Sequence, residues 1–384
     1  MTAASAPPPA TVAVAVEAAN QVGEARRAAA ALAAQLDFGD AAAGRVALVA
    51  TEAATNLARH ATGGVLLVQP VLSLDPRDGR TGVELVAVDR GPGIRDLERA
   101  SVDGYSTGGT AGQGLGAMRR AADAFDAYSA PTRVPDPFDP AAGRAVRAGA
   151  GPSGGTILVA RCWADGPRGE RDAEGAVRAG GVSVPLAGEG VCGDAWAVCR
   201  TRDGCRVLVA DGLGHGPLAA EAAQLAVRLF RADVARVAAT QDGAATLEAL
   251  LEALHAALRP TRGAAVAVAE VRLADREVHF AGVGNVAASI VAPDGEGRSL
   301  VSHNGTVGHQ LRKVQTFRYP WPEGASLVLA TDGLRTQWRL ADAPGLARRD
   351  PTVVAAALWR DHARGRDDAT AVVVRDAVVR DGGR

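Results

Sequence analysis

Residues 207–216 are VLVADGLGHG, an apolar strand pattern that ends in an Asp-Gly pair and a glycine-rich turn. Acidic residues also stand at the ends of other predicted strands, in the sequences CGDAW, LVLATDG and GRDDATAVVV. A single Asp-Gly pair is typical of an ordinary turn. Several acidic strand ends in one half of a chain instead predict carboxylate oxygens that a rigid sheet brings together around Mg²⁺ or Mn²⁺. The residues concerned are Asp194, Asp211, Asp332, Asp367 and Asp368.

The segments around these strand ends predict a β-sandwich flanked by helices. A helical pattern at 217–258 interrupts the strands, and another at 351–363 precedes the final strand. No internal repeat relates this half to the N-terminal one, so we expect two different domains. The strand patterns, recognised from their apolar runs and turn residues, are at 181–186, 194–200, 205–211, 264–273, 277–285, 326–333 and 369–376.

The order GD, DGxGxG, GN, TDG and DD over about 177–376 resembles the metal-dependent phosphatases of the protein phosphatase 2C superfamily, in the stage II sporulation protein E (SpoIIE) branch. The resemblance implies an α-β-β-α sandwich that holds two Mn²⁺ or Mg²⁺ ions and dephosphorylates serine or threonine. Two such ions activate a shared water for in-line attack on phosphorus. The implied ligands are Asp194 as the bridge, Asp211 with the Gly212 carbonyl for the first ion, and Asp332 with Asp367 for the second.

Other polar residues in this half have open interpretations. Asp368 is a further candidate ligand. His215 follows the acidic strand end closely, where a role in the site and a structural role in the turn are equally compatible with the sequence. Asn285 in GVGN, and Asn304 with His309 in SHNGTVGH, are candidate lining residues. We match no residue to the phosphate-binding arginine of the eukaryotic relatives.

The N-terminal half has helices before strands and a glycine-rich stretch, which favours a two-layer α/β sandwich over a βαβ repeat. A Pro-, Gly- and Ala-rich segment at 130–153 predicts an exposed loop. The predicted helices are near 17–36, at 44–61 and from about Leu115, and the predicted strands are at 65–74, 82–89 and 155–163.

Three groups of residues in this half suggest a ligand site when they are taken together. Glu52 and Asn56 are four residues apart on one helix face, which alone would indicate a solvated polar surface. Asp89 ends a strand before the turn RGPGI, whose glycines allow a ligand to approach the backbone, although an ordinary turn also fits. The stretch GGTAGQGLG at 108–116 opens a helix, where free backbone N–H groups favour phosphate.

The three groups in this order resemble the nucleotide-binding domain shared by gyrase, Hsp90 and histidine kinases, and more closely the bacterial anti-sigma-factor serine kinases. TEAATNLARHA corresponds to the N-box, DRGPGI to the first G-box and GYSTGGTAGQGLGAM to the ATP lid. The resemblance implies that Asn56 binds Mg²⁺ on ATP, Asp89 binds the adenine amine and Glu52 is the general base. Thr156 would assist at the adenine end. The glycines that would shape the pocket and lid are Gly91, Gly93, Gly112, Gly114 and Gly116.

The chain therefore divides into a tail at 1–10, an ATPase-like domain at 11–163, a linker at 164–176 and a phosphatase-like domain at 177–384. The net charge of −1 gives no electrostatic footprint for nucleic acid or an anionic membrane. Lys313 is the only lysine, which argues against a lysine-dependent P-loop. Without a signal-peptide pattern or a long apolar run, we expect a cytoplasmic α+β protein with reduced, mostly buried cysteines.

The two resemblances together imply a partner-switching regulator. We expect metal-dependent removal of phosphate from serine or threonine on an anti-sigma-factor antagonist of the sulfate-transporter/anti-sigma-antagonist (STAS) type, and ATP-dependent serine kinase activity in the N-terminal domain. In a second interpretation, the N-terminal domain is a nucleotide-gated binding module without transfer activity, which regulates the phosphatase or sequesters a sigma factor. Neither interpretation requires a nucleic acid or a membrane.

Overall fold

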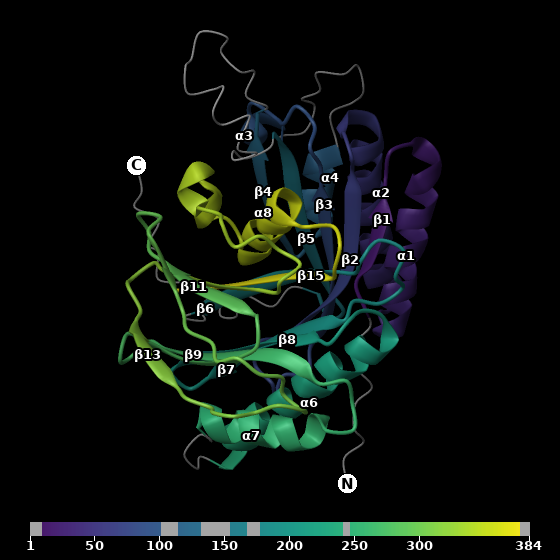
Figure 1. The fold of residues 1–384 in the computed structure, drawn as a ribbon. Helices are drawn as coiled ribbons and strands as arrows, with labels where there is room; N and C mark the ends of the chain where they lie inside the picture. The colour runs from purple at the N-terminus through teal and green to yellow at the C-terminus, as the bar shows by residue number, and fades with distance from the viewer. Residues whose placement is uncertain (1–9, 101–113, 132–153, 167–176, 241–245, 377–384) are drawn as a thin grey trace.

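The fold is described from a computed structural model (Figure 1). Several sequence-based predictions lie wholly or mostly outside the described residues: the N-terminal tail, the first part of the ATP lid with Gly112, the loop at 130–153, and most of the linker. The described residues are 10–100, 114–131, 154–166, 177–240 and 246–376.

The N-terminal half contains an antiparallel five-stranded sheet with helices on one face (Figure 1). Side chains of these helices, such as Leu32 and Val49, pack on sheet residues such as Leu66 and Leu85. The strand order is β1 (Val12–Ala15), β2 (Val65–Leu72), β3 (Thr81–Val88), β5 (Gly155–Trp163) and β4 (Ala124–Ala130). The helices are α1 (Val22–Gln35), α2 (Asp40–His60), the short α3 (Leu97–Ala100) and α4 (Gly114–Ala121).

Some boundaries in this half differ from the sequence-based prediction. The predicted first helix begins only at Val22, and the residues before it form β1, which pairs with β2 and buries Val14 opposite Leu66. The second helix begins at Asp40, because Asp40 suits the positive helix N-terminus and the alanines after it are strong helix formers. Strand β4 was not predicted, because its polar residues interrupt any apolar alternation.

The C-terminal half is a sandwich of two antiparallel five-stranded sheets around a core that includes Phe280, Trp321 and Leu327. The first sheet has the order β13 (Phe317–Pro320), β10 (Glu277–Val283), β9 (Ala264–Arg272), β8 (Gly204–Gly212) and β7 (Asp194–Thr201). The second has the order β12 (Gly297–Ser299), β11 (Ala287–Val291), β14 (Ser326–Ala330), β15 (Ala369–Asp376) and β6 (Val177–Val184). Strands β11, β12 and β13 were not predicted.

Helices cover the outer faces of this sandwich. Helices α6 (Pro217–Thr240) and α7 (Leu247–Leu258) lie on the first sheet, and α8 (Pro351–His362) lies on the second (Figure 1). The structure thus confirms the predicted fold class, an α+β chain with an α/β sandwich followed by an α-β-β-α sandwich.

Helix α8 also covers the second face of the N-terminal sheet. Val86 and Ile157 of that sheet belong to the same buried cluster as Val353 of α8 and Val373 of β15. A helix that is apolar on all sides is expected to be buried on all sides, and α8 contains the run VVAAALW. The two halves therefore share a helical layer. The sequence predicts two separate domains and does not indicate that they share a helix.

The four cysteines are buried and unpaired, as predicted for reduced thiols. Within the part of the chain that the structure describes, none of the helices combines the length and the apolar character needed to cross a bilayer.

Candidate functional sites

The acidic residues at the strand ends meet at one edge of the C-terminal sandwich. Asp194, the first residue of β7, is the register partner of Asp211 on β8. Opposite residues on antiparallel strands point to the same face. The second sheet reaches the same place, because the Thr331 hydroxyl donates a hydrogen bond of 2.8 Å to Asp194 Oδ2. Thr331 directly precedes Asp332, so this bond joins strand ends across the sandwich.

Burial and repulsion between carboxylates make Asp194 and Asp211 resist ionisation. The pKa of Asp194 is raised, first by burial and also by the charges of Asp368 and Asp367, although hydrogen bonds from threonine hydroxyls oppose the shift. The pKa of Asp211 is raised by burial and then by the charges of the other carboxylates. A divalent cation would relieve this repulsion, because it balances several negative charges at once.

The donor set fits such a cation in its chemistry. Carboxylate and carbonyl oxygens are the ligands that Mg²⁺ and Mn²⁺ prefer. Among the described residues, however, no three His, Cys, Asp or Glu side chains converge closely enough to form a metal site as they stand. The fit therefore rests on the oxygen donors and on their unbalanced negative charge. Gly212 has a packing role here, because a Cβ there would collide with the Ala219 carbonyl and only glycine permits this close approach of α6.

Asp368 has a structural task at this edge. Its Oδ1 accepts a hydrogen bond of 2.7 Å from the Leu186 N–H, and its Oδ2 accepts one of 2.8 Å from the Gly193 N–H. These bonds fix the loop that leads into Asp194. Asp368 also donates its own N–H to Asp367 Oδ1 at 2.9 Å, so it orients a candidate ligand as well.

Of the remaining polar candidates, the structure places one in contact with a candidate metal ligand and gives the others different surroundings. Asn285 donates a hydrogen bond of 2.7 Å to Asp332 Oδ2 and therefore lies at the acidic edge. His215 is half-exposed and its Nδ1 lies 2.6 Å from Glu189 Oε1. His309 is exposed and contacts the Thr261 carbonyl at 3.1 Å, and Asn304 is an exposed loop residue. Sequence reasoning missed Thr331, because only the aspartate of its TDG motif was considered, and it missed Glu189, which belongs to no motif.

In the N-terminal half, Asp89 lies where β3 ends beside the start of β5. Its N–H donates to the Thr156 carbonyl at 3.0 Å, and its Oδ1 accepts a hydrogen bond of 2.6 Å from the Gly91 N–H. Burial raises the pKa of Asp89, against the hydrogen bonds from Gly91 and Thr156. A Cβ at Gly91 would lie 2.9 Å from Asp89 Oδ1 and 3.0 Å from the His60 carbonyl, so the turn needs a glycine there.

The unpredicted strand β4 supports this end of the site. Ser129 Oγ accepts a hydrogen bond of 2.6 Å from the Ile94 N–H and lies 3.0 Å from Thr156 Oγ1. Gly93 has a φ of +74°, and a Cβ there would collide with the Ala130 carbonyl at the end of β4. Ser129 thus joins the glycine turn to Thr156, a link that no local motif reveals.

Glu52 and Asn56 form a second group with the start of α4. Both are half-buried on α2, and a Cβ at Gly114 would lie 3.2 Å from Glu52 Oε2 and from Asn56 Oδ1. Gly116 is buried in α4, whereas Gly112 lies outside the described residues. Helix α2 connects this group to the other one, because its last residue, His60, contacts the turn at Gly91.

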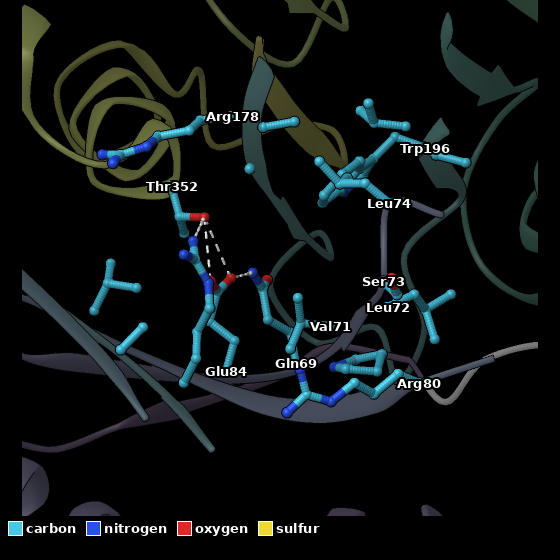
Figure 2. Close-up of a pocket in the computed structure, with 18 of the residues that line it drawn as sticks. Gln69, Val71, Leu72, Ser73, Leu74, Arg80, Glu84, Arg178, Trp196 and Thr352 are labelled. Carbon is cyan, nitrogen blue, oxygen red and sulfur yellow. Dashed lines mark hydrogen bonds and ion pairs between the residues drawn. The ribbon is translucent and has the colours of Figure 1, made fainter. Parts of the chain in front are cut away.

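A cavity of about 1050 Å³ lies between the two halves, away from the glycine turn. Figure 2 shows Gln69 and Glu84 from the N-terminal sheet facing Thr352 of α8 across part of its wall. Asp194 also lines this cavity, so the cavity reaches the acidic edge.

Protein-family comparisons match the chain in two separate stretches. The family described as a histidine kinase-like ATPase domain matches residues 15–134. The family described as stage II sporulation protein E (SpoIIE) matches residues 201–376. These matches confirm both resemblances drawn from the sequence motifs.

Curated relatives and solved structures are also similar to parts of the chain. The serine/threonine-protein kinase RsbT of Bacillus subtilis (strain 168) is 33% identical over 95 residues, or 25% of this chain and 68% of RsbT. The phosphoserine phosphatase RsbX of the same organism is 27% identical over 147 residues, or 38% of this chain and 69% of RsbX. A crystal structure of RsbX in complex with magnesium is 21% identical, with a TM-score of 0.42, over 52% of this chain and 95% of that one.

Proposed function

The chain belongs to the histidine kinase-like ATPase family through its N-terminal half and to the stage II sporulation protein E family through its C-terminal half, and on this premise we propose that it controls the phosphorylation of one antagonist protein. It has a partner-switching architecture, in which an RsbT-like kinase-like domain precedes an RsbX- and SpoIIE-like serine/threonine phosphatase domain. We assign these domains to residues 11–163 and 177–384, joined by a linker at 164–176.

The meeting of acidic strand ends at Asp194 and Asp211 is the observation that carries the phosphatase proposal. When bound there, Mn²⁺ or Mg²⁺ ions supply a hydroxide at neutral pH and polarise the phosphoryl group. The chain's own residues provide the oxygen donors, and Thr331 and Asp368 fix those donors through hydrogen bonds. The proposed ligands are Asp194, Asp211, the Gly212 carbonyl, Asp332 and Asp367.

In the N-terminal domain we propose that ATP binds with Mg²⁺ between the glycine turn and the start of α4. Asp89 accepts a hydrogen bond from the adenine amine, supported by Thr156, and Asn56 binds the metal on the phosphates. Glu52, one helical turn before Asn56, takes the proton from the attacking serine hydroxyl. Support comes from the position of Gly114 beside Glu52 and Asn56, since a Cβ on it would lie 3.2 Å from an oxygen of each. The proposed shaping glycines are Gly91, Gly93, Gly112, Gly114 and Gly116.

We propose a STAS-type anti-sigma-factor antagonist as the substrate of both activities, in the cytoplasm. The kinase-like and phosphatase domains would then set the phosphorylation of one serine or threonine in opposite directions. The alternative, in which the N-terminal domain binds nucleotide only to regulate the phosphatase, is favoured by one observation. Arg360 of α8 reaches the backbone of Asp89, so the two domains contact each other at the nucleotide turn.

The proposal is tested by reconstitution with the full chain and a candidate antagonist. Wild-type protein with Mn²⁺ should release phosphate from the phosphoserine form, and EDTA should stop the release. The same protein carrying Asp194→Asn should incorporate label from ATP into the unphosphorylated antagonist, because the product is no longer removed. Release that continues in EDTA contradicts the phosphatase proposal, and absence of incorporation favours the binding-module alternative.

A further inference from the structure

The N-terminal end of α8 is fixed to the nucleotide half by a buried ion-pair network. Arg161 of β5 pairs with Glu84 of β3 and makes hydrogen bonds of 2.6 and 2.8 Å to Asp350, the N-cap of α8. Burial would raise the pKa of Asp350, but the charge and hydrogen bonds of Arg161 lower it. The Thr352 hydroxyl lies 3.2 Å from Glu84 Oε1 (Figure 2). Breaking one partner of a buried pair is costly, so this end of α8 is held in place.

The C-terminal end of α8 contacts the turn that carries the proposed adenine-binding carboxylate. The Arg360 side chain is 1% exposed, and its guanidinium lies 3.5 Å from the Asp89 carbonyl. In the other direction, the Arg90 guanidinium donates a hydrogen bond to the Arg360 carbonyl. Asp361 orients Arg360 through a contact of 2.8 Å. The Asp89 backbone and the Arg90 side chain therefore both contact Arg360 in the last turn of α8.

The same end of α8 continues directly into the acidic edge of the phosphatase half. The His362 carbonyl accepts a hydrogen bond of 2.9 Å from the Arg335 N–H, and the Arg364 N–H donates one of 2.8 Å to the Gly333 carbonyl. Gly333 follows Asp332, and a Cβ on it would collide with the Asp368 carbonyl. A movement of this helix end therefore changes the turn after Asp332 and the segment that holds Asp368.

We propose that Arg360 is a positioning residue that couples nucleotide binding at Asp89 to the acidic strand ends at Asp332 and Asp368. This inference rests on the proposed function, because it requires both a nucleotide at Asp89 and metal-dependent hydrolysis at the acidic edge. A nucleotide that draws Asp89 into a new hydrogen bond shifts the 89–91 turn and with it the last turn of α8. Because the N-terminal end of α8 is fixed at Asp350, the shift is confined to its C-terminal end.

Coupling of this kind is measurable, because linked sites commonly change each other's properties by about fivefold or more. The experiment uses the full chain, an aryl phosphate substrate, adenosine diphosphate as the nucleotide, and buffered free Mn²⁺. The readout is the ratio of hydrolysis with and without nucleotide, which a merely structural defect would leave unchanged. Asp89→Asn is the control for chelation of Mn²⁺ by the nucleotide. Because this variant should bind the nucleotide only weakly, any change in its hydrolysis comes from chelation.

Two variants, called the route variants, change the contacts between Asp89 and α8 without changing either proposed site. Arg90→Ala removes the guanidinium of an exposed residue that bonds to the Arg360 carbonyl, and Arg360→Lys removes the guanidinium that contacts the Asp89 carbonyl. Arg26→Ala, on the exposed face of α1, is the matched control. We expect the nucleotide to change wild-type and Arg26→Ala hydrolysis by about fivefold or more, and to change both route variants less than about twofold. Hydrogen exchange at amides 333–335 and 361–364 should change with nucleotide in wild-type and Arg26→Ala protein, but not in the two route variants.

The outcomes distinguish this inference from the function on which it rests. If calorimetry shows nucleotide binding and Mn²⁺-dependent hydrolysis is normal, but the wild-type ratio is one, the coupling is refuted. If nucleotide changes hydrolysis by Arg90→Ala as much as it changes wild-type hydrolysis, the route through Arg360 is refuted. This result is decisive even if Arg360→Lys does not fold. Absence of nucleotide binding, or hydrolysis without metal, overturns the proposed function and this inference with it.

Discussion

Asp194 and Asp89 both stand at strand ends, yet their surroundings differ in charge. Asp194 faces other carboxylates, and burial together with their repulsion raises its pKa. Asp89 accepts a hydrogen bond from the Gly91 N–H, and the Arg360 guanidinium lies at its carbonyl. The acidic edge therefore accumulates negative charge, whereas the nucleotide turn is organised by glycine backbone, hydrogen bonds and a nearby arginine.

This difference teaches what each site depends on. The acidic edge is expected to depend on a cation, because burial of several carboxylates is costly until positive charge balances them. The nucleotide turn is expected to depend on the placement of donors and acceptors, because Gly91 and Gly93 already hold its backbone in one shape. Mutations should therefore change metal dependence at the first site and nucleotide affinity or transfer at the second.

The largest expected effect is on phosphate transfer, and it distinguishes Glu52 from the residues that bind the nucleotide. Glu52→Gln should lower phosphate transfer to the antagonist by about 10²–10⁴-fold if Glu52 is the general base. Adenosine diphosphate affinity should change less than about twofold, because the proposed contact of Glu52 is with the attacking hydroxyl. Transfer is measured in an Asp194→Asn background and affinity by calorimetry. Normal transfer in Glu52→Gln would place the base elsewhere.

The next effect concerns the adenine end. Asp89→Asn replaces one acceptor oxygen by an amide donor, and it should weaken adenosine diphosphate binding by about tenfold to a hundredfold. Asp96→Asn, at an exposed position in the same loop, is the matched control and should bind normally. Equal affinities of the two variants by calorimetry would show that Asp89 does not contact the adenine amine.

The acidic edge has its own positioning hydroxyl in Thr331. Thr331→Val keeps the shape but removes the bond to Asp194 Oδ2, and the Mn²⁺ concentration for half-maximal hydrolysis should rise about tenfold. Thr331→Ser keeps a hydroxyl and should restore most of the metal affinity. If valine and serine behave alike, the hydroxyl does not orient Asp194.

The smallest effect is on thermal stability and its dependence on pH. Because the folded-state pKa of Asp194 and Asp211 lies above the ordinary value, the folded chain retains protons that the unfolded chain releases. The stability of metal-free protein should therefore fall as pH rises above about 4, towards the raised values. Mn²⁺ should raise Tm by a few degrees (about 2–6 °C), and more at high than at low pH. If the rise in Tm caused by Mn²⁺ does not depend on pH, the raised pKa of Asp194 and Asp211 is contradicted.

The sequence predicts much of both sites, because strand ends followed by Asp-Gly pairs are local signals. Strand β8 with Asp211 and strand β15 after Asp367 lie where their apolar runs predict them. Strand β4 escaped prediction, since its pairing with β5 and not its own pattern makes it a strand. Ser129 and its contact with Thr156 were missed for the same reason.

Helix α8 was predicted at 351–363, but its shared position between the two halves was missed for a different reason. Its sequence predicts a helix, and its apolar character on all sides indicates burial on all sides. No local pattern identifies the second sheet that buries it. Arg161 and Asp350 are separated by 189 residues, so their ion pair is invisible to any rule based on spacing.

The central claim is that buried carboxylates at strand ends hold the cations on which hydrolysis depends. The most direct test is a Mn²⁺ titration of the metal-free full chain, following bound metal and aryl phosphate hydrolysis together. The matched variants are Asp194→Asn and Asp203→Asn, at opposite ends of the β7–β8 hairpin. We predict that hydrolysis follows metal binding in wild-type and Asp203→Asn protein, and that Asp194→Asn loses metal and more than about 10²-fold of the activity. Hydrolysis by metal-free protein, or an Asp194→Asn titration like that of the wild type, would contradict the account.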